Sequence, residues 1–516
     1  LVFRTGQGIF TSLNQWSSIT ELPLAEPPHA VRVSQCLALG IGPDSHGLQV
    51  RLQFVLLSDT PCLLWNMRVE NRRSTPIYLE RLDLLRLGLD PGSELQNGWQ
   101  APAFFSNGWG SWNHTGTYGL KDRFQRTRLG PLTEPMRVNA GTPHPTRTGR
   151  FSSDMFGVLG DRLNRRAVLL GFLSQKQHFG SLQTWLAPPG PTLQLWANGD
   201  GARLDPGATL STDWAALFPL NLQDPDPLQP YLEMVAHHHD LEPGFPQDRQ
   251  VPVGWCSWYH YYSQVSAADI TENLESAQEL QDRLPLPLLQ IDDGFEAQVG
   301  DWFEFNDRFP GGVAPLAAVI HTAGLQPGLW LAPFIVHPRS NLYREHPDWL
   351  LRGRLNRPVN AGFSFRDALC TALDLTHPEA LDYAAEVVST AVHNWGFPYL
   401  KLDFLYAGAL PGQRFDPSLT RAQTFRRGLE ALRTAAGTEA TLVGCGCPLG
   451  PAIGLVEAMR IGADVSESWL PTYAGSPFVV HREPDYPSTR NAIQNSLTRA
   501  TLHRRWWIND PDCLLV

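Results

Sequence analysis

The chain has 516 residues and a formal net charge of −10 at pH 7, a length that allows two or three domains with large hydrophobic cores. The acidic balance and the lack of a long basic run argue against nucleic acid or an anionic membrane as the main partner, and no apolar run of about 18 residues predicts a membrane span. The N-terminal sequence lacks the pattern of a signal peptide, and the seven Cys are scattered and odd in number, which is typical of a reduced, cytoplasmic protein.

Residues 1–235 predict an all-β sandwich domain. Short alternating runs recur, such as "LQVRLQFVLL" (48–57), "IYLERLDLLRLGL" (77–89) and "RAVLLGFL" (166–173). Turn clusters rich in Gly, Pro, Asn and Asp separate these runs, and no convincing helical period is seen. Many short strands joined by such turns favour a large sandwich.

Residues 236–250 are predicted to connect this domain to a second one. The run "PYLEMVAHHHDL" (230–241) predicts a short helix, and "EPGFPQDRQ" (242–250) predicts a linker. The triplet His237–His239 is not expected to bind a metal, because consecutive residues of a helix face different ways.

From residue 251 to 516, apolar strands alternate with amphipathic helices, which predicts a parallel sheet in a TIM barrel or a doubly wound fold. Helices are expected near 266–281, where Ser266 and Asp269 make a capping pattern, at 378–395 and at 418–435. A polar, Arg-rich insertion is expected at about 337–375. The strands are expected at 251–258, 286–294, 326–336, 398–406, 440–449, 458–466 and 505–516.

Each of these strands starts apolar and becomes polar near its C-terminal end. Because active sites of TIM barrels lie at that end of the strands, acidic residues repeated there favour a catalytic site over scattered helix caps. The polar residues at the strand ends are Trp258 and Tyr259, Asp292 and Asp293, Lys401 and Asp403, Cys445, Arg460 and Asp464, and Asn509 and Asp510.

The strand "PYLKLDFLY" (398–406) contains two charges on one face, because Lys401 and Asp403 are two residues apart. Buried charges are costly unless they are paired. Lys401 is expected to lower the pKa of Asp403 and to keep it ionised, as a nucleophile requires. Asp464 precedes a loop and suits a general acid, whereas Arg460, four residues earlier on the same face, could instead lower its pKa. The sequence leaves that conflict open.

No cofactor is expected, since the sequence has no GxGxxG after a strand and no Walker loop, and no metal is expected either. The lack of a GxSxG elbow argues against a Ser/His/Asp nucleophile. Cys445 and Cys447 are two residues apart, but no second pair of ligands follows, so zinc is not expected. Paired carboxylates point to glycoside hydrolysis. The 17 Trp also suggest carbohydrate, because flat apolar rings stack on sugars, although most are expected in the core.

At these residues the chain resembles the α-galactosidases of glycoside hydrolase family 36, the retaining melibiase group. The similarity covers residues 251–516 and includes "GWCSWYHYY", "QIDDGFEAQVGDW", "RFPGG", "GLWLAPF", "YLKLDF", "GCGCPLG", "RIGADVS" and "WINDPD". It implies an N-terminal β-sandwich followed by a catalytic (β/α)8 barrel. In that family an eighth strand and a small C-terminal β-domain follow "NDPD", and neither is expected within residues 1–516.

The resemblance also implies roles for individual residues. Asp403 corresponds to the nucleophile and Asp464 to the acid/base. The resemblance places the remaining residues around galactose: Asp292 and Asp293 at the 4- and 6-hydroxyls, Lys401 at the 3- and 4-hydroxyls, Cys445 and Arg460 at the 2-hydroxyl, Trp258 and Trp330 along the pocket, and Trp109 or Trp112 reaching in from the sandwich loop "NGWGSWNHTGTY" (107–118).

The activity implied is hydrolysis of terminal α-D-galactosyl residues of galacto-oligosaccharides, such as melibiose or raffinose, by double displacement. Galactosyl transfer and α-N-acetylgalactosaminidase activity are alternatives on the same fold. A sugar-binding protein without activity is disfavoured, because both catalytic Asp are present. The sequence leaves the natural oligosaccharide and assembly into a homo-oligomer undecided.

Overall fold

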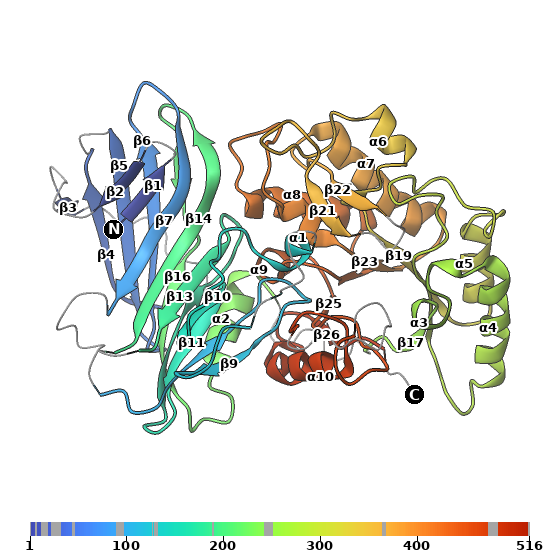
Figure 1. The fold of residues 1–516 in the computed structure, drawn as a ribbon, viewed down its shortest axis with the longest axis horizontal. Coiled ribbons are helices and arrows are strands. Elements are labelled where there is room, and N and C mark those ends of the chain that lie inside the picture. Colours follow the sequence, from blue (N-terminus) through green and yellow to red (C-terminus); the bar gives the residue numbers. More distant parts are fainter. Residues whose placement is uncertain are drawn as a thin grey trace.

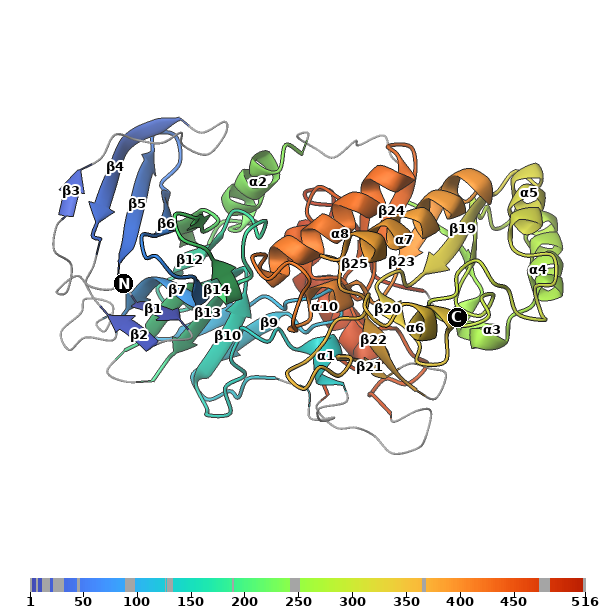
Figure 2. The ribbon, with the colours of Figure 1, turned by 90° about the horizontal axis from the view of Figure 1, so that it is seen from above.

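The computed structural model describes residues 2–5, 8–11, 19–21, 32–43, 47–88, 98–125, 127, 133–187, 190–241, 251–363, 368–472 and 483–513. The N-terminal half forms antiparallel β-sheets, and the C-terminal half forms an α/β part beside them (Figure 1). Seen from above, the two parts lie side by side along the long axis of the molecule (Figure 2).

The N-terminal part consists of two antiparallel sheets. The smaller sheet has the order β10 (Arg150–Asp154), β13 (Gly180–Trp185), β14 (Thr192–Leu204), β7 (Ile77–Leu87), β1 (Val2–Thr5) and β2 (Gly8–Thr11). The larger sheet has the order β3 (Ile19–Glu21), β4 (Val33–Ile41), β5 (Leu48–Leu57), β6 (Leu63–Asn71), β16 (Ala215–Asn221), β12 (Arg166–Phe172), β11 (Phe156–Asp161), β8 (Pro102–Ser106) and β9 (Gly116–Gly119), and β15 (Thr209–Ser211) pairs with β6.

A hydrophobic core fills the space between these sheets. Val50 on β5 and Met67 on β6 come from the larger sheet, and Leu79, Leu182 and Leu195 come from β7, β13 and β14 of the smaller one; all five are buried in one cluster. Alternate residues of each strand face this core, because side chains of a strand point to opposite faces in turn. The predicted all-β N-terminal fold is therefore confirmed.

The C-terminal part contains seven parallel strands. Their order is β17 (Gly254–Cys256), β18 (Leu288–Ile291), β19 (Gln326–Leu331), β23 (Tyr399–Leu402), β24 (Thr441–Gly444), β25 (Ala458–Arg460) and β26 (Ile508–Asp510). The α-helices of the described residues are α1 (Glu134–Arg137), α2 (Gln229–His238), α3 (Trp258–Tyr261), α4 (Ala267–Glu279), α5 (Ala314–Thr322), α6 (Asn341–Glu345), α7 (Pro378–Ser389), α8 (Arg421–Ala436), α9 (Leu449–Ala452) and α10 (Thr489–Thr498).

These strands form an incomplete barrel of the TIM type. Strands β17 and β26 are the two edges of the sheet, and the described residues contain no strand that joins them. The fold class therefore agrees with the sequence: antiparallel N-terminal sheets are followed by parallel strands of the TIM type. None of the described helices combines the length and the apolar character needed to cross a bilayer.

Several predicted elements are confirmed, although the strands are shorter than expected: β17 ends before Trp258, which begins helix α3, and β25 ends at Arg460. Helix α4 begins at a capping box in which Ser266 accepts a hydrogen bond from the Asp269 backbone and Asp269 bonds back. The single strand predicted at 326–336 is wrong. It divides into β19 and the short strand β20 (Ile335–Val336), because Pro333 has no backbone N–H to continue the pairing.

Strand β20 forms a small antiparallel sheet with β22 (Leu369–Ala372) and β21 (Asn360–Phe363), and the latter two lie inside the insertion. The predicted helix at 378–395 is helix α7, followed by a π-helical turn over Thr390–Asn394. The predicted short helix at 230–241 is α2, and the predicted linker 242–250 lies outside the described residues. The division of the chain into domains at 235 and 251 stays a prediction.

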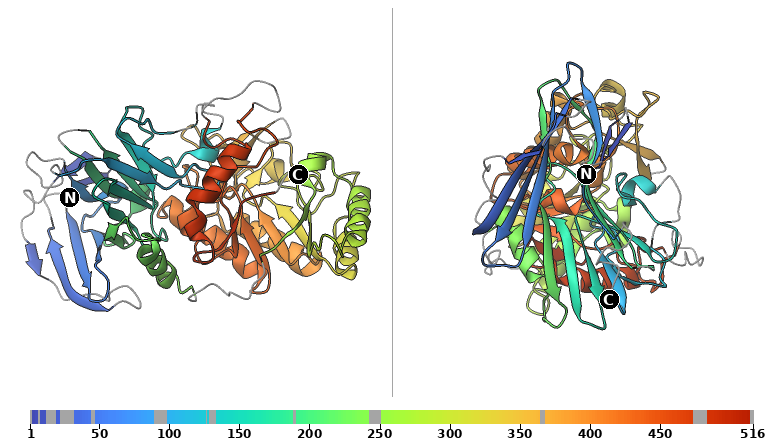
Figure 3. Two further views of the ribbon diagram at one scale, coloured as in Figure 1. Left: turned by 90° about the horizontal axis from the view of Figure 1, so that it is seen from below. Right: turned by 90° about the vertical axis from the view of Figure 1, so that its left-hand side faces the viewer.

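The two parts are held together at the loop 107–118, which follows β8 of the sandwich. The guanidinium of Arg499, on the barrel side, is buried and donates hydrogen bonds to the carbonyls of Ser111 (2.7 Å) and Gly110 (3.0 Å) and to Oγ1 of Thr115 (3.0 Å). Helix α10 leads into Arg499 and packs against β9, as seen from below in Figure 3, where it is red. The sandwich loop is therefore fixed against the C-terminal ends of the barrel strands.

Candidate active site

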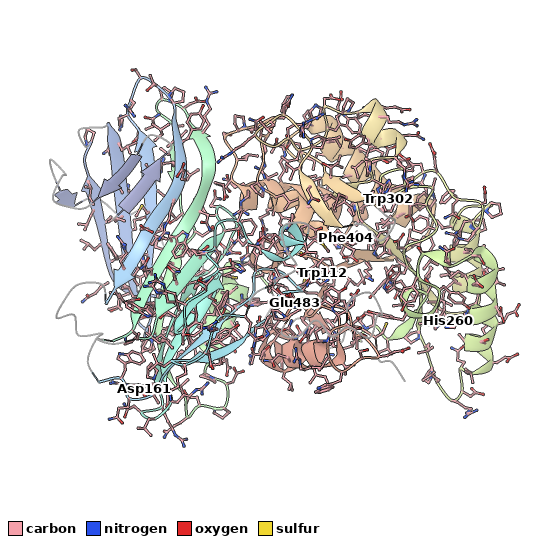
Figure 4. All side chains as sticks on the ribbon, viewed as in Figure 1. Trp112, Asp161, His260, Trp302, Phe404 and Glu483 are labelled. Atoms are coloured by element: carbon pink, nitrogen blue, oxygen red, sulfur yellow. The ribbon has the colours of Figure 1, made fainter. Side chains whose placement is uncertain are left out.

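A cavity of about 570 Å³, counting the open space at its mouth, lies at the C-terminal ends of the parallel strands. Figure 4 shows Trp112 of the sandwich loop beside Phe404 of the barrel in this region. The residues that line the cavity are Trp112, Met136, Arg137, Trp258, Asp292, Asp293, Trp330, Lys401, Asp403, Phe404, Ala463, Asp464, Asp485 and Pro487.

Lys401 and Asp403 reach this cavity from strand β23. The apolar residues Leu400 and Leu402 alternate with them and are fully buried in the barrel core, which turns the two charged side chains to the other face. Oδ2 of Asp403 accepts a hydrogen bond from the indole Nε1 of Trp330 (3.1 Å), and Oδ1 accepts one from the backbone N of Phe404 (2.7 Å). The carboxylate is thus held in a fixed orientation.

The backbone at Phe404 has a left-handed conformation, with φ of 52° and ψ of 28°. This conformation is unfavourable for a bulky residue, and such strain occurs at functional sites when the surroundings enforce it. Here the edge of Trp112 packs against the ring of Phe404 at 5.4 Å between ring centroids. The turn directs the Phe404 N–H back to the Asp403 carboxylate.

Asp292 and Asp293 follow strand β18 directly. Oδ2 of Asp292 accepts hydrogen bonds from Lys401 Nζ (2.9 Å) and from Gln290 Nε2 (2.7 Å), and the Sγ of Cys256 lies 3.4 Å from it. Asp292 is 2% exposed and Asp293 is 4% exposed. The Lys401 ammonium of β23 therefore pairs with the Asp292 carboxylate after β18, and strand β19 lies between these two strands in the sheet.

The charge states in this cluster follow from burial and from neighbouring charges. Burial alone would lower the pKa of Lys401, but the carboxylates of Asp292 and Asp403 outweigh it and hold the pKa well above its usual value. Burial raises the pKa of Asp403, with a further increase from Asp464, whereas Lys401 and the Trp330 hydrogen bond lower it. The net shift is upward, so the predicted lowering of the Asp403 pKa is wrong in sign. The sequence shows the neighbouring lysine but not the burial that outweighs it.

Asp464 lies after strand β25 and forms an ion pair with Arg460, with Oδ1 2.7 Å from Nη2. Arg460 also forms an ion pair with Asp512, whose carboxylate accepts a hydrogen bond from the Tyr259 hydroxyl. Burial raises the pKa of Asp512 to about 6, although Arg460 acts to lower it. Arg460 thus pairs with the carboxylates of both Asp464 and Asp512. The sequence indicated the first of these contacts but not the second.

Eight of the eleven residues predicted for the site line the cavity, and three do not. Trp112 lines it, whereas Trp109 is buried in the core and packs edge-on against Phe179, with 5.8 Å between ring centroids. Of the two loop tryptophans, only Trp112 therefore reaches the cavity. Cys445 is 1% exposed and Arg460 is 2% exposed. Both lie behind the wall, next to the charged groups, rather than on its surface.

Six residues of the cavity wall were not predicted. Ala463 and Phe404 are sequence neighbours of the two Asp proposed for catalysis, and proximity in the sequence could have indicated them. Met136 and Arg137 belong to helix α1 of the N-terminal half, and Asp485 and Pro487 lie in the loop before α10. No local pattern marks these four, because only the packing of the two halves brings them to the cavity.

Comparisons with known proteins agree with this arrangement. The family model described as Melibiase matches residues 239–418. An α-galactosidase of Geobacillus stearothermophilus is 32% identical over 187 residues, and α-galactosidase 2 of Pediococcus pentosaceus is 28% identical over 189 residues. These matches cover 34% and 35% of this chain, but only 24% and 25% of the two relatives.

Solved structures match over a larger part of the chain. An α-galactosidase from Thermus thermophilus, in complex with p-nitrophenyl α-D-galactopyranoside, has a TM-score of 0.64 at 30% identity, and the match covers 90% of this chain and 82% of that one. The family 36 α-galactosidase of Geobacillus stearothermophilus shares the fold at 16% identity, with a TM-score of 0.59 and coverage of 97% and 75%. With the family model, the fold and this cavity in agreement, the chain belongs to the melibiase group of glycoside hydrolase family 36, the family of the α-galactosidases.

Proposed function

We propose that the chain hydrolyses terminal α-D-galactosyl residues of galacto-oligosaccharides, with retention of configuration at the anomeric carbon. The observation that carries the proposal is the single cavity that brings Asp403 and Asp464 together with the Asp292–Lys401 ion pair. Two carboxyl groups beside a cluster that binds sugar hydroxyls are what glycoside hydrolysis requires.

In the first step, an oxygen of the Asp403 carboxylate attacks the anomeric carbon. The bond from this carbon to the leaving oxygen breaks, and Asp464 donates its proton to that oxygen. The products are a galactosyl ester of Asp403 and the free alcohol of the leaving group. The hydrogen bonds from Trp330 Nε1 and the Phe404 backbone would hold the attacking carboxylate in position.

In the second step, water takes the place of the leaving group. Asp464, now ionised, accepts a proton from this water while the water oxygen attacks the anomeric carbon and releases Asp403. Two inversions give net retention. Lys401 with Asp292 and Asp293 would bind the galactose hydroxyls, since a cation donates and carboxylates accept hydrogen bonds from a hydroxyl.

Substrates of the melibiose and raffinose type fit this proposal. Two of the similar structures are titled as complexes with stachyose and with raffinose. All seven Cys are free thiols, which supports the proposal that the protein works in the reducing cytoplasm. Assembly into a homo-oligomer stays a prediction.

The test is to replace Asp403 by Gly and to measure hydrolysis of an aryl α-galactoside with and without azide. Asp403→Gly should lose nearly all turnover, and azide should restore part of it by taking the place of the carboxylate. Proton NMR of the sugar first released by the parent enzyme should show the α-anomer. Near-normal kcat in Asp403→Gly, or initial release of β-galactose, would refute the proposal.

A further inference from the structure

The wall of the cavity contains a second polar group, which the proposed chemistry does not use. Arg137 of helix α1 and Asp485 of the loop before α10 both line the cavity. We propose that Arg137 and Asp485 bind the sugar that leaves when the galactosyl bond is cleaved. The inference rests on the proposed function and adds to it the recognition of the leaving group.

Arg137 is a buried cation, 8% exposed, and its Nε and Nη1 have no hydrogen-bond partner among the residues that the structure describes. Its guanidinium lies 5.7 Å from the centre of the Tyr486 ring, a weaker contact that satisfies neither nitrogen. Burying donors without acceptors is costly. A ligand in the cavity that offers oxygen acceptors would supply what the protein itself does not.

Asp485 provides the complementary acceptor. Its side chain is 5% exposed, Oδ1 accepts a hydrogen bond from the backbone N of His114 (2.6 Å), and Oδ2 lies 3.4 Å from Asn113 Nδ2. Burial raises the pKa of Asp485, and the charge of Arg137 acts in the opposite direction. Each carboxylate oxygen has two acceptor positions, so the group can accept further hydrogen bonds from hydroxyls.

The two groups are held in place from both halves of the molecule. Asn113 Nδ2 also donates to the backbone carbonyl of Arg137 at 2.7 Å, which ties helix α1 to the sandwich loop. Asn495 of helix α10 fixes that loop in turn, because its Nδ2 donates to the Asn113 carbonyl (3.0 Å) and its Oδ1 accepts from the Thr115 N–H (3.1 Å). Rigid groups bind with a smaller entropic cost.

The position of this pair along the cavity favours the leaving group over galactose. The segment that carries Asp485 lies next to Asp464, since the Ser488 N–H donates to the Asp464 carbonyl at 3.2 Å. Asp464 is the group proposed to protonate the leaving oxygen. The proposed galactose-binding groups Asp292 and Lys401 instead come from β18 and β23, which lie four and two strands from β25 in the sheet. A sugar bonded through the leaving oxygen would therefore lie on the Arg137 side.

The chemistry of the pair suits a sugar with adjacent hydroxyls. The planar guanidinium presents donors in a fixed fork, and the carboxylate accepts hydroxyl protons, so together they match a neutral vicinal diol. An aryl leaving group offers no such hydroxyls. The pair should therefore improve turnover of oligosaccharides more than turnover of aryl galactosides.

The experiment compares Arg137→Met and Arg137→Lys with the parent, by kcat/KM on melibiose and on p-nitrophenyl α-galactoside. Arg137→Met keeps the length of the side chain and removes the donors. It should lower kcat/KM on melibiose about tenfold or more, with a loss on the aryl substrate at least about fivefold smaller. Arg137→Lys keeps the charge but loses the fork, so its kcat/KM on melibiose should lie between the values of the parent and of Arg137→Met. If Arg137→Met does not fold, the comparison of Arg137→Lys with the parent tests the inference.

Inhibition by the two products gives a second measurement that does not depend on chemistry. Glucose should inhibit Arg137→Lys more weakly than the parent, whereas inhibition by galactose should change much less. The exposed Arg162→Met variant is the matched control. Equal losses on both substrates, or no loss on melibiose, would overturn the inference. Hydrolysis of the aryl substrate by the parent tests the proposed function separately.

Discussion

Lys401 is the residue that most directly couples charge to activity in this site. Asp403, the proposed nucleophile, must be ionised to attack, and its burial raises its pKa while Lys401 acts to lower it. The acid limb of kcat/KM in the free enzyme should therefore lie at a higher pH than an ordinary aspartate would give. Activity should be lost as the pH falls through this raised pKa.

Removing the cation should move that limb further. We expect Lys401→Met to shift the acid limb of the kcat/KM profile to higher pH, in addition to lowering the plateau, because the carboxylate loses its nearest positive charge. Lys121→Met, an exposed lysine of the sandwich, is the control. An acid limb at the same pH in Lys401→Met and the parent would contradict this account.

The Asp292 carboxylate should be needed for both binding and selectivity. It holds Lys401 at 2.9 Å and lies at the cavity wall. Asp292→Asn keeps the size but removes the charge, and we expect kcat/KM on aryl α-galactosides to fall at least about tenfold, or roughly 1.4 kcal/mol. The same loss is expected for Asp293→Asn.

A buried carboxylate outside the cavity provides the comparison for these variants. Asp301 accepts hydrogen bonds from the Asn341 and Leu342 N–H groups at the start of α6. Asp301→Asn should lower the melting temperature without the same loss of activity. Parent-like kcat/KM in both Asp292→Asn and Asp293→Asn, or a parent that prefers α-glucosides, would show that the pair does not select galactose.

At the scale of elements, the two capping boxes allow a matched stability test. Ser266 caps α4, and Thr420 caps α8 by accepting the Gln423 N–H. Thr420 Oγ1 also donates to the carbonyl of Gln177 in the sandwich at 2.5 Å. Ser266→Ala should cost about 1 kcal/mol. Thr420→Ala should cost roughly 1 kcal/mol more, because it also leaves a carbonyl of the other half without its donor.

Denaturant unfolding of both variants measures this difference from the shift in midpoint at constant slope. The helix content in the folded state is the check that neither helix has been lost. Equal destabilisation by the two substitutions would mean that the Thr420–Gln177 hydrogen bond contributes nothing to the joining of the halves.

The elements were predictable wherever a local pattern determines them. The cap at Ser266, the helix α8 and the polar ends of the parallel strands follow from spacing within a few residues. The break at Pro333 is also readable from the sequence, since proline cannot continue a parallel pairing, but the apolar run on both sides of it favours one continuous strand. The split of that strand places Trp330 at its end, beside Asp403.

The part of the site that could not be predicted depends on contacts between distant segments. Trp109 and Trp112 are equivalent in the sequence pattern, and only the turn at 110–113 decides which of them reaches the cavity. Arg137 and Asp485 have no motif, because they meet across 348 positions of the chain through Asn113. The direction of the Asp403 pKa shift likewise depends on how deeply the rest of the fold buries its carboxyl group.

At the scale of the whole molecule, Arg499 is a buried clamp between the halves. Its guanidinium donates to the Ser111, Gly110 and Ile461 carbonyls, at 2.7, 3.0 and 2.9 Å. Arg499→Lys cannot satisfy all three acceptors, and an unsatisfied buried group costs about 1–3 kcal/mol. We expect a lower melting temperature, together with a lower kcat/KM because the loop that carries Trp112 loses its anchor.

Arg505 offers a control that also crosses between the halves. It forms an ion pair with Asp226 at 2.5 Å, and both side chains are 26% exposed. Because such pairs contribute about 0–1 kcal/mol, Arg505→Lys should change neither the melting temperature nor activity by much. If calorimetry gave the same shift for Arg499→Lys and Arg505→Lys, the buried clamp would have no special role.

The placement of Trp112 and Arg137 in the cavity wall has a thermodynamic consequence. A sugar that contacts both halves at once stabilises their docked arrangement, since it binds only when they are docked. Binding to the folded state alone stabilises it by RT ln(1 + [L]/Kd), or about 2.7 kcal/mol at a hundredfold excess over Kd. A high substrate concentration would then stabilise the docked halves against separation and unfolding. The lifetime of the enzyme in a cell would therefore increase with the supply of its substrate.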